Sequence, residues 1–276
     1  MVDKEPAKLH ALKGGAGQED AAPREDPPAA RSRGIFLLPN LITSGALFSG
    51  FYAIVASMNG NFEAAAMALF AAMILDAADG RVARLTRTES AFGAQYDSLS
   101  DMVAFGVAPA LLVFAWSLQS LGQAGWVATF IYMACAALRL ARFNMQEDHA
   151  VFVGLASPAA AALLAGLVWT FTENAPRAAG PDGLGAAALA IYTAGVGLLM
   201  VSPLRYWSPK TIRLAGRVPF FTLVAIVLAY AGVMLDPPRM LLGGVVIYAA
   251  SGPVMYFLQR ARRRRAAAEK KNAETR

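Results

Sequence analysis

Long apolar runs, separated by short polar gaps, follow one another along most of the chain. A helix needs about 20 apolar residues to span a bilayer, and eight runs approach this length. They cover residues 41–58, 62–84, 91–118, 124–143, 157–173, 184–202, 218–235 and 239–258. We find neither a strand-like alternation nor an internal repeat. The sequence therefore predicts an all-α fold, a polytopic membrane helix bundle of about eight transmembrane helices.

The two ends of the chain differ from this apolar region. Residues 1–34 combine glycines, prolines and mixed charges, a composition that cannot bury a core. They contain no apolar run of the kind that a signal peptide has. We therefore predict a disordered cytosolic tail over 1–34, a transmembrane domain over 35–259 and a basic cytosolic tail over 260–276. Pro39 is predicted to start the first helix, because its fixed φ suits the first turn.

Basic residues are distributed unevenly between the gaps, and this predicts the orientation of the chain in the membrane. The gaps after the second, fourth and sixth runs, with the adjoining helix ends, hold Arg81, Arg84, Arg87, Arg139, Arg142, Arg205, Lys210, Arg213 and Arg217. The alternate gaps hold only Arg177 and Arg239. Since basic residues favour the cytoplasmic side, we predict a multi-pass protein of the cell (inner) membrane with both termini in the cytoplasm.

The composition supports a membrane protein and disfavours several other classes. Hydrophobic residues make up 57% of the chain and charged residues only 16%, whereas a soluble domain carries about a quarter charged residues. The net charge is +6, but no basic stripe is interleaved with aromatic residues, so we expect no nucleic-acid partner. Cys135 is the single cysteine and His10 and His149 lie outside the apolar runs, so neither an internal disulfide nor a histidine metal site is expected.

Four aspartates interrupt the second and third apolar runs. They are Asp76, Asp79, Asp97 and Asp101. An ionisable side chain at membrane depth costs at least about 2.5 kcal/mol, so such a group indicates a functional site. Four of them together require counter-charge, which bound divalent cations supply through carboxylate ligands. We therefore predict a metal site in which these carboxylates hold two hard cations, Mg²⁺ or Mn²⁺.

Helical geometry brings these four acids to one place. On the second run Asp76 shares a face with Gly80, Ala83 and Arg87, and Asp79 lies about 60° to the side. On the third run Gly93, Asp97 and Asp101 follow one another at four-residue spacing. With a turn near residues 86–90, antiparallel packing places both pairs of acids roughly 12–15 Å from the turn. The predicted site therefore lies in the cytosolic half of the membrane and opens to the cytoplasm.

The residues between the acids have two interpretations each. Gly80, Ala83 and Gly93 either permit close helix packing, as small residues often do in membranes, or leave room for a substrate against the backbone. Arg84 either pairs with a substrate phosphate or extends to the membrane interface. We favour the substrate interpretation for the small residues, because they alternate with the acids along the same helix faces. The two roles of Arg84 stay open.

The whole arrangement resembles the signature of the CDP-alcohol phosphotransferase family. All eight signature positions are present in Asp76-x2-Asp79-Gly80-x2-Ala83-Arg84-x8-Gly93-x3-Asp97-x3-Asp101. Within the family the chain is most similar to the integral-membrane phosphatidylserine synthases. The similar stretches are Leu38-Pro39-Asn40, Ser90-Ala-Phe-Gly93, Tyr96-Asp-Ser-Leu99, Phe105-Gly-Val-Ala-Pro109, Ala137-Leu-Arg-Leu-Ala-Arg-Phe-Asn144 and Ser157-Pro158. The resemblance covers about residues 35 to 160.

The resemblance implies a reaction and a role for each site residue. It implies transfer of the phosphatidyl group from CDP-diacylglycerol to an alcohol, here the hydroxyl of L-serine, with release of CMP. Asp76, Asp79 and Asp97 would ligate the metals, and Asp101 would be a ligand and the general base. The donor-binding residues would be Thr43, Gly80, Ala83, Arg84 and Gly93. The resemblance also implies a CDP-alcohol phosphotransferase fold, a catalytic domain over 35–259 and a homodimer.

The acceptor is the open part of this interpretation. Arg139 and Arg142 share a helix face, so one of them is a candidate to bind the serine carboxylate; alternatively both only mark the cytoplasmic flank. Arg213 and Arg217 are second candidates. Glycerol 3-phosphate, inositol phosphate or choline would keep the same chemistry with another acceptor. An intramembrane cation transporter is a different class, but the outer halves of the second and third runs are almost wholly apolar, which disfavours an ion path.

Overall fold

The structure is a computed structural model that describes residues 33–86, 88, 90–145, 154–175, 177–204, 206 and 220–274. Residues 1–32 of the tail predicted over 1–34 lie outside this range, as do His10, Arg87, His149, Arg205, Lys210, Arg213 and Arg217. The described residues form helices and no strand. The helices are α1 (Arg33–Met58), α2 (Phe62–Thr86), α3 (Ala91–Asp101), η1 (Met102–Val107), α4 (Ala108–Trp116), η2 (Leu118–Leu121), α5 (Gln123–Met145), α6 (Ser157–Thr172), α7 (Leu184–Val201), α8 (Phe220–Leu235) and α9 (Pro237–Glu274). The predicted all-α class is therefore confirmed.

Four of the described segments are long and apolar enough to cross a membrane. They are Leu38–Met58, Ala91–Trp116, Gln123–Met145 and Leu184–Val201. Two shorter apolar helices cover Ser157–Thr172 and Thr222–Leu235. The chain is therefore a helical membrane protein. Helix α2 is less apolar than these four because Asp76, Asp79 and Arg81 lie inside it. The predicted count of eight spans stays a prediction.

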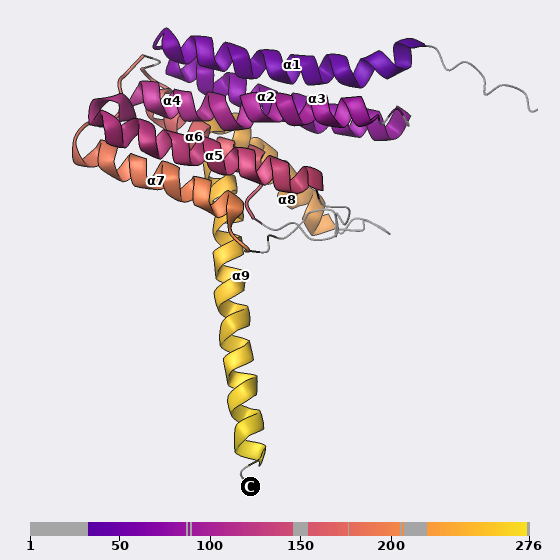
Figure 1. The fold of residues 1–276 in the computed structure, drawn as a ribbon, viewed down its shortest axis with the longest axis vertical. Helices are drawn as coiled ribbons and strands as arrows, with labels where there is room; N and C mark the ends of the chain where they lie inside the picture. Colours follow the sequence, from indigo (N-terminus) through magenta and orange to yellow (C-terminus); the bar gives the residue numbers. More distant parts are fainter. Residues whose placement is uncertain are drawn as a thin grey trace, which may run out of the picture. The chain divides into compact units, whose positions relative to one another are not determined.

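The helices pack closely where small residues face a neighbouring backbone. Helix α5 packs along α7, and α6 contacts both α2 and α9; Figure 1 shows α5 and α7 side by side. A Cβ atom on Gly197 would lie only 2.8 Å from the Cα of Tyr132 on α5. On α1, a Cβ atom on Gly50 would lie 2.8 Å from the Cα of Ala104 in η1. Glycine at these two positions is therefore required by the close approach of helix axes.

Helix α1 begins earlier than the sequence predicts. It starts at Arg33, so Pro39 lies inside the helix and not at its start. This prediction was wrong because the φ of proline is compatible with a helix, and the ring removes only one backbone hydrogen bond. In the next turn the Ser44 hydroxyl donates to the Asn40 carbonyl at 2.8 Å.

The third predicted span is a continuous run of helix whose backbone hydrogen-bond pattern changes in the middle from α-helical to π-helical. Helices α3 and α4 are joined by the π-helix η1, which begins directly after Asp101. Pro109 lies at the start of α4 and has no N–H to donate to the Phe105 carbonyl four residues earlier. The hydroxyl of the fully buried Tyr132 donates to this carbonyl at 2.9 Å. The π-helix therefore accommodates the proline, and α5 supplies the missing donor.

This contact yields a stability prediction. The substitution Tyr132→Phe removes the donor and leaves the Phe105 carbonyl buried without a partner, a change that costs about 1–3 kcal/mol. We expect the thermal unfolding midpoint in detergent to fall by several degrees. Tyr230→Phe is the matched control, because Tyr230 is 65% exposed. An unchanged midpoint for Tyr132→Phe would contradict the role of this hydrogen bond.

The turn between α2 and α3 holds the two acid-bearing helices in antiparallel order. Thr86 ends α2, and its hydroxyl donates to the Val82 carbonyl at 2.7 Å. Ser90 caps α3, because its hydroxyl accepts the Gly93 N–H at 3.0 Å. The predicted position of the turn, at residues 86–90, is confirmed. Helix α9 differs from the prediction at its far end, since it continues through the basic segment to Glu274.

Candidate active site

Three of the four predicted acids converge in the structure. Carboxylate oxygens of Asp76, Asp97 and Asp101 all lie within 4.8 Å of one another. Asp76 comes from α2, whereas Asp97 and Asp101 occupy successive turns of α3. All three side chains are half-buried. The equal distance of both helix segments from the turn therefore produces the predicted cluster.

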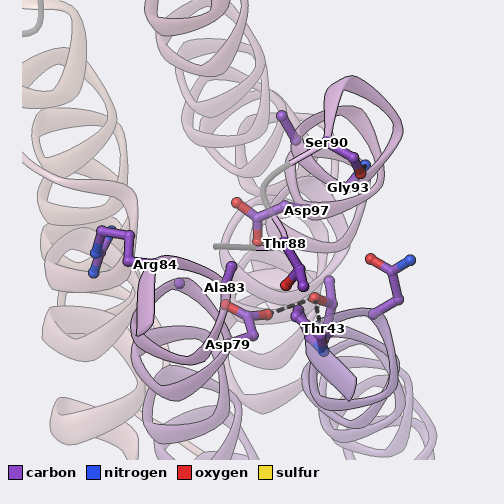
Figure 2. A pocket seen from close by; sticks show the side chains of 12 residues that line it. Thr43, Asp79, Ala83, Arg84, Thr88, Ser90, Gly93 and Asp97 are labelled. Atoms are coloured by element: carbon purple, nitrogen blue, oxygen red, sulfur yellow. Dashed lines mark hydrogen bonds between the residues drawn. The ribbon is translucent and has the colours of Figure 1, made fainter. Parts of the chain in front are cut away.

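The fourth acid, Asp79, lies beside this cluster and turns toward α1. It is buried, and its Oδ2 accepts a hydrogen bond of 2.6 Å from the Thr43 hydroxyl. Figure 2 shows Asp79 directed at Thr43, with Asp97 on the facing helix. Asp79 is not one of the three acids that converge. Because it lies one turn from Asp76 with its side chain rotated to the side, it extends the cluster toward α1.

A cavity of about 340 Å³ opens next to Asp79 and Asp97. Its walls come from the start of α1, the end of α2 and the start of α3 (Figure 2). The lining residues are Pro39, Asn40, Thr43, Asp79, Gly80, Ala83, Arg84, Thr88, Ser90, Gly93, Ala94 and Asp97. All five residues predicted to bind the donor are among them. Asn40, Thr88 and Ser90 are polar wall residues that helical spacing did not identify. Thr88 and Ser90 lie in the turn between α2 and α3, and Asn40 lies beside Pro39 in α1.

A Cβ atom on either glycine of the cavity would meet side chains and not the backbone of a neighbouring helix. A Cβ atom on Gly80 would meet only the Arg84 guanidinium, at 3.7 Å, and no neighbouring backbone. A Cβ atom on Gly93 would lie 3.1 Å from the Ser90 hydroxyl and 3.4 Å from the Asn40 side chain. Both positions therefore keep the cavity open, unlike Gly50 and Gly197. Arg84 is exposed and extends away from Thr43, at the edge of the cavity (Figure 2).

Beyond the acids the bundle is sealed by apolar side chains. Ala72 lies one turn before Asp76, and Phe105 lies one turn after Asp101. Both are fully buried, and they pack in one cluster with Ala104 and Ala161. The Phe105 carbonyl is occupied by Tyr132. Among the described residues, the acids are therefore followed at this end of the site by buried apolar side chains.

The two candidate acceptor arginines differ sharply in environment. Arg139 is half-buried, donates to the Ser157 hydroxyl of α6, and lies within electrostatic range of Asp101. Arg142, one turn later, is exposed. Their shared helix face did not distinguish them, because three residues on a helix differ by about 60° in direction. Only Arg139 faces the acids.

The donor set fits a hard divalent cation. Carboxylate oxygens of Asp76, Asp97 and Asp101 lie within 4.8 Å of one another. Ionised carboxylates this close repel each other unless a proton or a cation offsets their charge. Ligand oxygens around Mg²⁺ lie about 3–4 Å apart when each bond is about 2.1 Å long. Oxygens already within 4.8 Å reach this spacing by small side-chain rotations. The residues present therefore fit a Mg²⁺ or Mn²⁺ ion.

Comparison with known proteins agrees with this geometry. The sequence profile of the CDP-alcohol phosphatidyltransferase family matches residues 36–250. A Helicobacter pylori protein named CDP-diacylglycerol–serine O-phosphatidyltransferase is 35% identical over 198 residues, which are 71% of this chain and 81% of that protein. The Bacillus subtilis protein of the same name is 33% identical over 170 residues, covering 61% and 89%.

A Mycobacterium tuberculosis protein of that name is 39% identical over 150 residues, covering 51% of this chain and 52% of its own. The profile match spans most of the chain and includes all four acids, the cavity and Arg139. The similarity and the site geometry lead to the same conclusion. The chain belongs to the CDP-alcohol phosphatidyltransferase family.

Proposed function

We propose that this enzyme transfers the phosphatidyl group of CDP-diacylglycerol to the hydroxyl of L-serine and releases CMP. One observation carries the proposal: the carboxylates of Asp76, Asp97 and Asp101 converge beside a cavity large enough for a nucleotide head group. A lipid donor with a charged head group accounts for acids at membrane depth. The relatives named CDP-diacylglycerol–serine O-phosphatidyltransferase support serine as the acceptor.

The donor would bind in the cavity with its pyrophosphate against the acid cluster. Asp76, Asp79, Asp97 and Asp101 would hold the metal, two ions of Mg²⁺ or Mn²⁺. When bound, the metal supplies positive charge that neutralises the pyrophosphate and stabilises the leaving CMP. Gly80, Ala83 and Gly93 would leave room for the nucleotide, and Thr43 keeps Asp79 oriented by its 2.6 Å hydrogen bond. Arg84, at the cavity edge, is available to a phosphate.

The chemical step is a displacement at the phosphorus that carries diacylglycerol. Asp101 takes the proton of the serine hydroxyl, and the hydroxyl oxygen forms a bond to this phosphorus. The phosphoanhydride bond to CMP breaks, and CMP leaves with the electron pair on its phosphate oxygen. Arg139 would bind the serine carboxylate, since its guanidinium lies near Asp101. The acceptor would thus lie between Arg139 and Asp101.

An acceptor panel tests the proposed activity. Purified protein in mixed micelles receives CDP-diacylglycerol, Mn²⁺ or Mg²⁺, and labelled serine, glycerol 3-phosphate, inositol phosphate or choline in parallel. We expect phosphatidylserine and CMP in equal amounts, and no lipid from the other acceptors. Folded protein that makes no phosphatidylserine would refute the serine assignment, and another labelled lipid would identify the acceptor. Ion flux into proteoliposomes without CMP release would instead support a transporter.

We also propose the membrane arrangement that this reaction requires. Eight spans would place both termini and the active site at the cytoplasmic face of the cell (inner) membrane, where serine and CMP are found. The uneven distribution of basic residues supports this orientation. The catalytic domain would cover 35–259 and would be flanked by tails over 1–34 and 260–276. The family resemblance supports a homodimer.

Gly80→Leu tests whether the cavity binds the donor. The larger side chain would fill the space beside Arg84 without meeting a neighbouring backbone. We therefore expect the KM for CDP-diacylglycerol to rise about tenfold or more, a loss of about 1.4 kcal/mol in binding, with the unfolding midpoint unchanged. Gly195→Leu is the control, because a Cβ atom at Gly195 meets nothing within 4 Å. An unaltered donor KM in Gly80→Leu would show that the cavity is not the donor site.

A further inference from the structure

One buried hydroxyl lacks a partner, and it belongs to a residue that the reaction described above does not use. Tyr206 follows α7 and is 6% exposed. Its hydroxyl is the buried side-chain atom of the described residues for which no hydrogen-bond partner is present. Burying a hydroxyl without a partner destabilises the folded state, so such a group calls for an explanation such as a ligand or a bound water.

The ring of Tyr206 is held by close packing against α9. It lies 5.6 Å from the Tyr248 ring, measured between centroids, at an angle of 38°. A Cβ atom on Gly252 would lie 2.5 Å from the Tyr206 ring, so glycine there is what admits the ring. The hydroxyl is therefore fixed in place by the residues around it, and side-chain rotation toward solvent is restricted.

Two connections join Tyr206 to Arg139. The first is Tyr248, which lies within electrostatic range of Arg139. The second is the backbone: the Gly154 N–H donates to the Leu204 carbonyl at 2.8 Å, and Ser157, three residues after Gly154, accepts a hydrogen bond from Arg139. Gly154 has a φ of +89°, and a Cβ atom there would lie 2.1 Å from the Met200 carbonyl oxygen. This close contact therefore brings the segments of Tyr206 and Ser157 together.

Arg139 has donors left to give. Its guanidinium carries five N–H groups, of which one contact goes to Ser157. Within the described part of the chain the ion pairs shorter than 4.0 Å involve Arg239 and not Arg139. Arg139 is a half-buried guanidinium with donors to spare, and Tyr248 connects it to a buried hydroxyl that has no partner. Such a pair of donors is suited to a carboxylate, which accepts hydrogen bonds at both oxygens.

We propose that Tyr206 is a specificity-determining residue whose hydroxyl donates a hydrogen bond to the acceptor carboxylate, alongside Arg139 and against the Tyr248 ring. The proposal rests on the proposed function, because it takes the acceptor to be an amino acid. It gives the last hundred residues of the chain, through Tyr206 and Tyr248, a part in choosing the acceptor. Alcohols without a carboxylate would leave this hydroxyl unpartnered.

Tyr206→Phe tests the proposal by two readouts. Removal of an unpartnered hydroxyl leaves no new buried polar group, so the unfolding midpoint without serine should equal or exceed that of the wild type. The KM for serine should rise about tenfold, whereas kcat at saturating serine and the KM for CDP-diacylglycerol should change less than about twofold. Serine should also raise the unfolding midpoint of the wild type more than that of the variant.

Tyr192→Phe is the matched control, since the Tyr192 hydroxyl has a backbone partner, the Leu163 carbonyl at 3.3 Å. It should lower the midpoint and leave the KM for serine unchanged. A wild type that neither binds serine nor makes phosphatidylserine would refute the proposed function itself. If the wild type does both, then an unchanged serine KM in Tyr206→Phe, an equal rise in both KM values, or a variant that fails to fold would overturn this inference alone.

Discussion

Replacing Asp101 by asparagine is expected to lower kcat by about 10³-fold or more while the protein still binds CDP-diacylglycerol. Asparagine keeps the shape and one oxygen of the side chain but cannot take the proton of the acceptor hydroxyl. Asp101 lies at the end of α3, within 4.8 Å of Asp76 and Asp97 and in the range of Arg139. No other described carboxylate combines contact with the cluster and proximity to this arginine.

Two measurements test this expectation. The first is the rate of phosphatidylserine formation at saturating serine. The second is donor binding, measured as the rise in the unfolding midpoint that CDP-diacylglycerol produces. Asp182→Asn is the control, because Asp182 is exposed in the loop before α7. It should have wild-type activity. If Asp101→Asn retained wild-type rates, Asp101 would not be the base, and Asp97 on the preceding turn would be the next candidate.

Replacing Asp76 or Asp79 by asparagine is expected to weaken the metal and the donor together. Each substitution removes a negative charge from the group that holds the cation, so the Mn²⁺ concentration for half-maximal activity should rise about tenfold or more. The KM for CDP-diacylglycerol should rise in parallel, since the pyrophosphate binds through the metal. The measurement is a Mn²⁺ titration of activity at several donor concentrations.

Thr43→Val provides a graded comparison with these two variants. It keeps the volume of the side chain but removes the hydroxyl that donates to Asp79 at 2.6 Å. A charge-assisted hydrogen bond orients its acceptor. Loss of this bond should therefore raise the Mn²⁺ concentration for half-maximal activity, but by less than Asp76→Asn or Asp79→Asn does. If Asp76→Asn and Asp79→Asn left the metal requirement unchanged while lowering kcat, these acids would act in the chemical step and not as ligands.

Much of the fold and of the acid cluster could be predicted because both follow from local rules. Apolar runs of sufficient length gave helices whose bounds agree closely; α5, for instance, covers Gln123–Met145 for a predicted 124–143. The cluster depended only on helix rise and on a turn at residues 86–90. Since Asp76 and Asp97 are nearly equidistant from that turn, antiparallel packing brought them to one level.

What could not be predicted depends on contacts between distant segments. Pro39 looked like a helix start, because a proline in the first turn and a proline inside a helix have the same helical φ. The π-helix before Pro109 had a visible cause in the proline, but its stabilising donor, Tyr132, lies on another helix. Tyr206 carried no signal at all, since its significance comes from packing against α9.

The position of a bound metal ion tests the central claim most directly. Crystals of the protein grown with Mn²⁺ and CDP-diacylglycerol would show each Mn²⁺ as a peak in anomalous scattering. We predict peaks in contact with the carboxylates of Asp76, Asp97 and Asp101. Asp79 should contact a peak from the side of the cavity that binds CDP-diacylglycerol. Peaks elsewhere, or none in crystals of active protein, would contradict the assignment of these acids as the metal site for phosphatidyl transfer.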